Sequence, residues 1–138
     1  MTVVDTNIIL DISGDETRWL IWASEQLAAA LERGPVIIND VIFAELCAHQ
    51  TDVTAVEALI ADFGLTHMPM SRRALFLAGK AHASYRKSGG LKLNVLPDFF
   101  IGAQAVDLGV PLLTRDTRRY RSYFPGLELI APETPGIG

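Results

Sequence analysis

Short apolar stretches alternate with longer stretches of helical periodicity along this chain. The pattern predicts strands at residues 2–4, 36–38, 65–68, 111–113 and 127–130, and helices at residues 17–32, 39–49, 53–63, 71–87 and 97–108. Repeated strand–helix units of this length predict an α/β fold, with a central parallel sheet of about five strands and helices on both faces. Ligands of such folds bind beyond the carboxyl ends of the strands.

The length and the cysteine count narrow the class of protein. A chain of 138 residues fits one domain that needs no disulfide to fold, and the lone Cys47, expected to be a buried small hydrophobe, excludes a CxxC redox or zinc motif. No apolar run reaches the roughly 18 to 20 residues of a membrane span, and a basic secretory signal region is missing, so a cytoplasmic protein is expected. Residues 133–138 are expected to form a mobile tail behind a domain of residues 1–132.

Four acidic residues stand at or near the carboxyl ends of the predicted strands. Asp5 follows the first strand, Glu45 lies in the helix after the second, Asp98 is in the first turn of the 97–108 helix, and Asp116 follows the strand at 111–113. Each acid alone also fits a structural role, as a cap, a helix-dipole partner or a solvated side chain. Asp5, Glu45 and Asp98 have apolar neighbours and no basic residue close by, so they need a compensating cation. An all-carboxylate site suits Mg²⁺ or Mn²⁺ rather than zinc.

The segments around these acids resemble the motifs of a known nuclease family. VVDTNIIL, Glu45, LPDFFIGAQA and LLTRDTRRY are similar to the four acidic motifs of PIN-domain ribonucleases. Their order and spacing resemble the bacterial VapC toxins of type II toxin–antitoxin pairs, and the similarity extends from Val3 to about Pro132. The resemblance implies a three-layer PIN-like fold over residues 1–132. It also implies an Mg²⁺- or Mn²⁺-dependent endoribonuclease, a toxin that inhibits translation and growth.

The resemblance implies a role for each acid. Asp5 and Asp98 are expected to be the primary metal ligands, and Glu45 and Asp116 are expected to bind the metal or to orient water. Hydrogen bonds that fix the carboxylate rotamers are expected from Thr6, Asn7 and Thr114. Metal-activated water attacks phosphorus without the ribose 2′-hydroxyl, so cleavage should leave a 5′-phosphate and a 3′-hydroxyl.

Basic residues are concentrated in one segment of an otherwise acidic chain. Residues 72–121 carry a net charge of +7, whereas the remainder carries −11. Such a segment can hold a polyanion, and the resemblance implies RNA, such as a transfer RNA or a ribosomal loop. The side chains expected to contact phosphates are Arg72, Arg73, Lys80, Arg86, Lys87, Arg115, Arg118 and Arg119. His82, Tyr85 and Tyr120 could stack on unpaired bases. For these three side chains, a place on a helix surface or in the core is nevertheless favoured. A structural role is expected for His49 and His67.

A toxin of this kind has a protein partner that restrains it. The resemblance implies a VapB-like antitoxin, a homodimer and a higher toxin–antitoxin complex. The helices at 17–32 and 53–63 carry many apolar residues, including Trp19 and Trp22, and could form a groove for an antitoxin helix. Packing of these residues in the core explains them equally well.

Other classes of protein fit parts of the pattern. A receiver domain and a haloacid-dehalogenase-like phosphatase also place Asp after the first strand. The receiver needs an acidic pair before that strand's Asp, and the phosphatase usually has a second Asp two residues on, where this chain has Asn7. A non-catalytic RNA-binding or protein-interaction module on the same fold would typically lack one or more of the acids, and all four are present.

Overall fold

The computed structural model describes residues 1–14, 18–92 and 95–133. Its five strands form one parallel sheet in the order β3-β2-β1-β4-β5. These strands are β1 (Thr2–Val4), β2 (Val36–Ile38), β3 (Leu65–His67), β4 (Leu112–Leu113) and β5 (Leu129–Ile130). The α/β fold with a parallel sheet, predicted from the alternating pattern, is confirmed.

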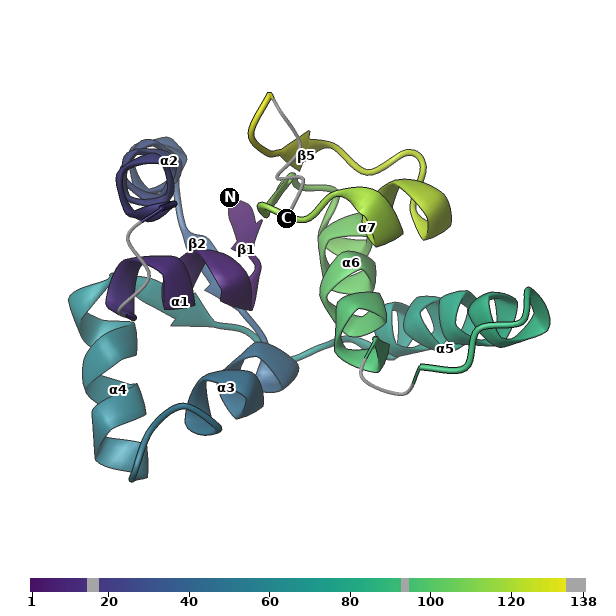
Figure 1. The fold of residues 1–138 in the computed structure, drawn as a ribbon, viewed down its shortest axis with the longest axis horizontal. Helices are drawn as coiled ribbons and strands as arrows, with labels where there is room; N and C mark the ends of the chain where they lie inside the picture. Colours follow the sequence, from purple (N-terminus) through teal and green to yellow (C-terminus); the bar gives the residue numbers. More distant parts are fainter. Residues whose placement is uncertain (15–17, 93–94, 134–138) are drawn as a thin grey trace.

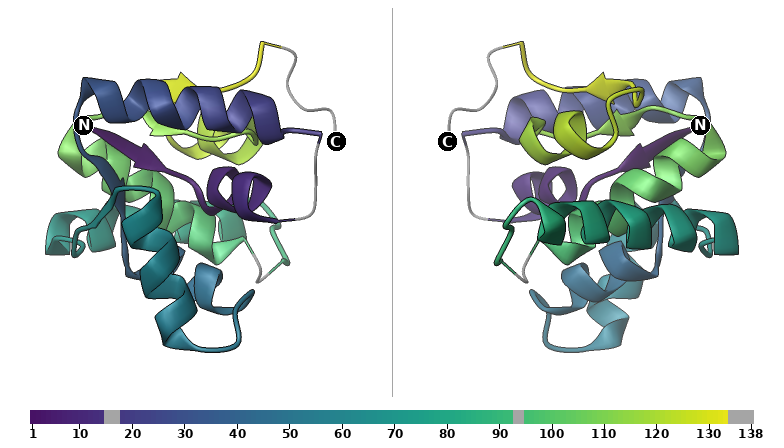
Figure 2. Two further views of the ribbon diagram at one scale, coloured as in Figure 1. Left: turned by 90° about the vertical axis from the view of Figure 1, so that its left-hand side faces the viewer. Right: turned by 90° about the vertical axis from the view of Figure 1, so that its right-hand side faces the viewer.

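Helices cover both faces of this sheet (Figure 1). One side carries α1 (Thr6–Ser13), α2 (Leu20–Arg33), α3 (Asp40–Cys47) and α4 (Val53–Asp62), and the other carries α5 (Arg72–Lys87), α6 (Leu96–Leu108) and α7 (Arg118–Tyr123). The division follows from right-handed crossovers, because the chain moves outward from β1 to β3 and then crosses to β4 and β5. Figure 2 shows the same layers from the two sides.

The predicted helices are present, with two additions and shifted ends. The short helices α1 and α7 were not predicted. The helix expected from residue 17 begins at Leu20, and its expected start lies outside the described residues. The expected tail also lies outside them, apart from Glu133. The helix expected through residue 49 ends at Cys47, which is half-buried rather than buried.

Local signals set the helix ends. Asn39 caps α3 by accepting a hydrogen bond from the Ile42 N–H, and Ser71 caps α5 by accepting one from the Ala74 N–H. Gly109 ends α6 in the left-handed conformation, with φ of 68°, which glycine adopts at low cost. No helix within the described parts of the chain is long and apolar enough to cross a membrane.

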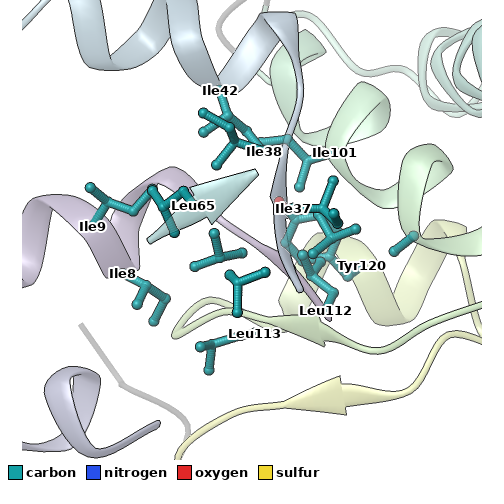
Figure 3. Packing of buried hydrophobic residues seen from close by; sticks show 14 of the residues in the cluster. Ile8, Ile9, Ile37, Ile38, Ile42, Leu65, Ile101, Leu112, Leu113 and Tyr120 are labelled. Carbon is teal, nitrogen blue, oxygen red and sulfur yellow. The ribbon is translucent and has the colours of Figure 1, made fainter. Parts of the chain in front are cut away.

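The core lies between the sheet and its two helical layers (Figure 3). Val3, Ile37 and Leu112 are fully buried on adjacent strands, as expected for a parallel sheet covered on both faces. Ile8 of α1 and Ile101 of α6 are also fully buried. This packing gives β1 the rigidity of a central strand, and Asp5 follows directly at its carboxyl end.

Candidate active site

The four predicted acids meet at the carboxyl edge of the sheet. Asp5 joins β1 to α1, Glu45 lies on α3, Asp98 is in the first turn of α6, and Asp116 lies between β4 and α7. All four line one cavity of about 210 Å³. The other residues that line it are Thr6, Asn7, Leu10, His49 and Tyr120. The fold therefore brings together acids that are up to 111 positions apart in the sequence.

Asp5 is the most buried of these carboxylates, at 5% exposure. Its Oδ2 accepts hydrogen bonds from the hydroxyls of Thr114 and Tyr120, each at 2.8 Å. Burial raises the pKa of Asp5 to about 7; Asp98 and Glu45 add to the rise, and the two hydroxyl groups oppose it. Asp5 is therefore only about half ionised at pH 7, and a bound cation would favour its ionised form.

The three residues predicted to support the acids all make hydrogen bonds at this site. The Thr6 hydroxyl donates to Glu45 over 2.6 Å. Asn7 Nδ2 lies 3.4 Å from both Asp5 Oδ2 and Thr114 Oγ1. Thr114 Oγ1 also accepts from the Asp116 N–H at 3.1 Å, so one threonine connects the loops after β1 and β4.

Asp98 has a basic partner in space, although none stands near it in the sequence. Arg119 Nη1 donates to Asp98 Oδ2 over 2.8 Å, and the guanidinium lies 5.9 Å from the ring centre of Tyr85. Burial raises the pKa of Asp98, and the hydrogen bond and charge of Arg119 partly offset this rise. Asp98 was expected to need a compensating cation, and in the fold Arg119 of α7 supplies a positive charge to it.

The donor set of the cavity fits a hard divalent cation. The cavity is lined by four carboxylates, two hydroxyls and one side-chain amide, and oxygen ligands of this kind are those that Mg²⁺ and Mn²⁺ prefer. Among the described residues, however, no three acidic, histidine or cysteine side chains already have an arrangement that could hold a metal ion. The hydrogen bonds explain this difference, because Glu45 is turned to Thr6 and Asp98 to Arg119.

Two participants were not expected from the sequence. Tyr120, considered there for base stacking or for the core, is 2% exposed and donates to Asp5. Asp11 of α1 pairs with Arg115 through two hydrogen bonds of 2.6 and 2.9 Å. The spacing of Asn7 and Asp11, one helical turn apart, is the signal that could have placed Asp11 beside the site. His49 also lines the acidic cavity, whereas His67 pairs with Asp40 at 2.6 Å.

The basic residues predicted to contact RNA lie in different places. Those on α5 are Arg72, Arg73, Lys80, Arg86 and Lys87, and none of them lines the acidic cavity. Arg118 and Arg119 of α7 line a neighbouring cavity of about 290 Å³, which also has Asp116 in its wall. The remaining lining residues are Tyr85, Ser122 and Tyr123. Arg118 and Arg119 therefore share a cavity with Asp116, whereas Arg115, the remaining predicted contact, pairs with Asp11.

Trp19 and Trp22 line a separate cavity of about 580 Å³. Its other wall consists of Gln26 and residues 131–133, rather than of α4 as the predicted groove required. The two indole rings meet edge to face, with centres 6.1 Å apart. None of the four acids lines this cavity.

Comparisons with known proteins agree with this fold. Among curated proteins there is no significant match. Among solved structures, a chain of VapBC2 from Rickettsia felis bound to a promoter DNA fragment has 17% identity and a TM-score of 0.71, over 94% of this chain and 97% of that chain. A chain of VapBC-1 from nontypeable Haemophilus influenzae has 17% identity and a TM-score of 0.69, over 94% and 96%. A chain of a toxin–antitoxin complex from Klebsiella pneumoniae has 22% identity and a TM-score of 0.64, over 94% and 96%.

At these identities the structural likeness establishes the fold, and the family follows from the sequence. The family model described as the PIN domain matches residues 2–124. No finding favours the receiver or phosphatase alternatives. Because the model covers nearly the whole chain, the resemblance predicted from the acidic motifs is confirmed, and the chain belongs to the PIN-domain family.

Proposed function

We propose that this protein is a metal-dependent endoribonuclease and the toxin of a VapBC-type toxin–antitoxin pair. The observation that carries the proposal is the convergence of Asp5, Glu45, Asp98 and Asp116 on one cavity, with Asp5 buried and its pKa raised to about 7. Clustered carboxylates of this kind are costly unless a cation compensates them. Such a cost is typical of a site kept for its chemistry.

Asp5 and Asp98 would hold the cation, with Glu45 and Asp116 binding it or orienting water. When bound, Mg²⁺ or Mn²⁺ supplies a Lewis acid for the phosphate and lowers the pKa of a coordinated water. The protein contributes the orientation of the carboxylates. Thr114 and Tyr120 fix Oδ2 of Asp5, and Thr6 fixes Glu45.

RNA is the proposed substrate, and two basic side chains stand beside the acids to receive it. Arg118 and Arg119 line the cavity that shares Asp116 with the acidic one. Arginine contacts to phosphate supply affinity without reading sequence. The basic residues of α5 extend the positive segment and are proposed as further phosphate contacts.

The proposed toxin role includes an antitoxin and self-association. Structures of similar fold are VapBC complexes and a toxin–antitoxin complex. We therefore expect the purified protein to elute as a dimer or a larger complex in size-exclusion chromatography. Activity from a monomer at nanomolar concentration would contradict the dimer.

The function is tested by incubating total RNA with the protein in Mg²⁺, in Mn²⁺ and in EDTA, and then mapping the new ends. We expect cleavage in either metal, none in EDTA, and ends bearing a 5′-phosphate and a 3′-hydroxyl. Glu45→Gln should abolish cleavage. Asp107→Asn is the matched control, because Asp107 lies on α6 like Asp98 but pairs with Arg73 and Ser71 outside the cavity. Cyclic 2′,3′-phosphate ends or cleavage in EDTA would contradict the mechanism.

A further inference from the structure

Arg119 contacts one acid of the acidic cavity from a neighbouring element. It extends from α7 and donates one hydrogen bond of 2.8 Å to Oδ2 of Asp98, a proposed metal ligand. Both side chains are partly open to solvent, at 26% and 29% exposure. The guanidinium and a divalent cation would therefore compete for one carboxylate, because each is a positive charge seeking the same oxygen.

The contact differs from the other arginine pair near the site. Arg115 holds Asp11 through two hydrogen bonds, from Nε and Nη2, and Asp11 is only 5% exposed. Two parallel hydrogen bonds to a buried carboxylate form a fixed pair. The single, partly exposed hydrogen bond of Arg119 is weaker, since solvent can replace it.

Arg119 has space to move without refolding of α7. Its side chain lines the cavity of about 290 Å³ next to the acids, together with Arg118 and Ser122. Asp116 belongs to both cavities. A guanidinium that leaves Asp98 can therefore stay in this neighbouring cavity, whose wall includes Asp116.

We infer that Arg119 is a displaceable counter-ion of the acidic cavity: it holds Asp98 while no divalent cation is bound, and gives up this carboxylate when the cation binds. The inference rests on the proposed metal site and adds a positioning residue to it. The ion pair accounts for two features together. Arg119 compensates the charge of Asp98, and within the described parts of the chain no three acids are arranged to hold a metal ion. Metal binding must then include the cost of breaking the Arg119–Asp98 contact.

Calorimetric titration of the metal-free protein with Mn²⁺ tests the inference. Arg119→Ala removes the competitor, so it should bind Mn²⁺ more tightly than wild type, by up to roughly fivefold, as expected for loss of one partly exposed charge contact. Arg119→Lys keeps the positive charge and should bind close to wild type. Arg118→Ala is the matched control, because Arg118 lies on the same helix and lines the same cavity, while Arg119 makes the hydrogen bond to Asp98. Its Mn²⁺ affinity should change much less.

A second readout follows the guanidinium itself. In ¹⁵N NMR spectra, the Arg119 side-chain signal, assigned from its absence in Arg119→Lys, should shift as Mg²⁺ is added, whereas that of Arg115 should shift less. Equal or weaker Mn²⁺ binding by Arg119→Ala would show that Arg119 only supports Asp98, and would overturn the inference while the metal site stands. If wild type and variants alike bind no Mn²⁺, the proposed metal dependence fails, and the inference fails with it.

Discussion

Tyr120 donates a 2.8 Å hydrogen bond to Oδ2 of Asp5, 115 residues earlier in the chain. The tyrosine is 2% exposed, and burial together with Asp5 and Asp98 raises its own pKa well above the usual value. The hydroxyl therefore keeps its proton and remains a donor at neutral pH. It ties α7 to the carboxyl end of β1 at the point where the proposed chemistry takes place.

Tyr120→Phe should destabilise the metal-free protein more at pH 8 than at pH 5. At pH 8 the hydroxyl donates to an ionised Asp5, a bond of about 2 kcal/mol. At pH 5 Asp5 is largely protonated, since its pKa is raised to about 7, and a bond between neutral groups is worth about 1 kcal/mol. Urea denaturation in EDTA at the two pH values measures the difference. Tyr123→Phe is the control from the same helix, and an equal cost of Tyr120→Phe at both pH values would contradict the account.

The metal-free protein should lose stability as the pH rises from about 4 to about 7. The folded-state pKa of Asp5 is about 7 and its ordinary value is 3.8, so the folded state holds a proton that the unfolded state has released over this range. The contribution of Asp5 to the free energy of unfolding is therefore fully present below its ordinary pKa. It is lost as the pH rises through the folded-state pKa, and the loss amounts to up to roughly 4 kcal/mol. Thermal unfolding in EDTA across this range tests it. A melting temperature that rises over the same range in wild type, but not in Asp5→Asn, would contradict it.

The fold and the convergence of the acids could be predicted from the sequence. The order of strands and helices indicates the fold, and the position of each acid relative to a strand end indicates where its side chain lies. Asp5 and Asp116 come after strands that lie side by side in a parallel sheet, so their neighbourhood follows from the strand order. The helix α1 escaped prediction because it starts immediately after Asp5, and its isoleucines continue the apolar run of β1. The helix α7 has only six residues, too few for a clear helical period.

The pairings of charged side chains could not be predicted in the same way. Arg119 and Asp98 are 21 residues apart, and Arg115 and Asp11 are 104 apart. The excess of basic residues between 72 and 121 suggested one RNA-binding surface. The net charge of a segment, however, does not show which way each side chain points in the folded protein. The structure divides these residues among α5, α7 and an internal ion pair. Packing of α7 against α6 brings Arg119 to Asp98, whereas the pairing of β4 with β1 brings Arg115 beside Asp11 of α1.

Arg115→Ala should destabilise the fold, although Arg115 was predicted to contact RNA. The change leaves Asp11, at 5% exposure, without its two hydrogen bonds. Loss of one partner of a buried pair costs about 3 kcal/mol, somewhat less here because Arg115 is partly exposed. Arg118→Ala, on an exposed side chain, should cost less than about 0.5 kcal/mol. Urea denaturation of both variants measures this difference.

The double variant Arg115→Ala, Asp11→Asn separates the ion pair from other effects of Arg115. Asparagine removes the stranded charge, so the double variant should be more stable than Arg115→Ala alone. If the double variant is less stable by the sum of the two single changes, Arg115 and Asp11 are independent, and the pairing does not contribute to stability.

Asp5→Asn should abolish RNA cleavage while leaving the metal-free fold at pH 7.5 as stable as wild type or more stable. Asparagine keeps the shape of the side chain and an oxygen for the Thr114 and Tyr120 hydroxyls, but removes a buried charge. The response to Mg²⁺ then distinguishes the two proteins. A ligand that binds only the folded state at 100 times its Kd stabilises it by about 2.7 kcal/mol, so the melting temperature of wild type should rise by several degrees and that of Asp5→Asn hardly at all. A metal-free Asp5→Asn protein that melts well below wild type would show that the Asp5 charge stabilises the fold, because a carboxylate kept for metal binding adds repulsion, not stability, when the metal is absent.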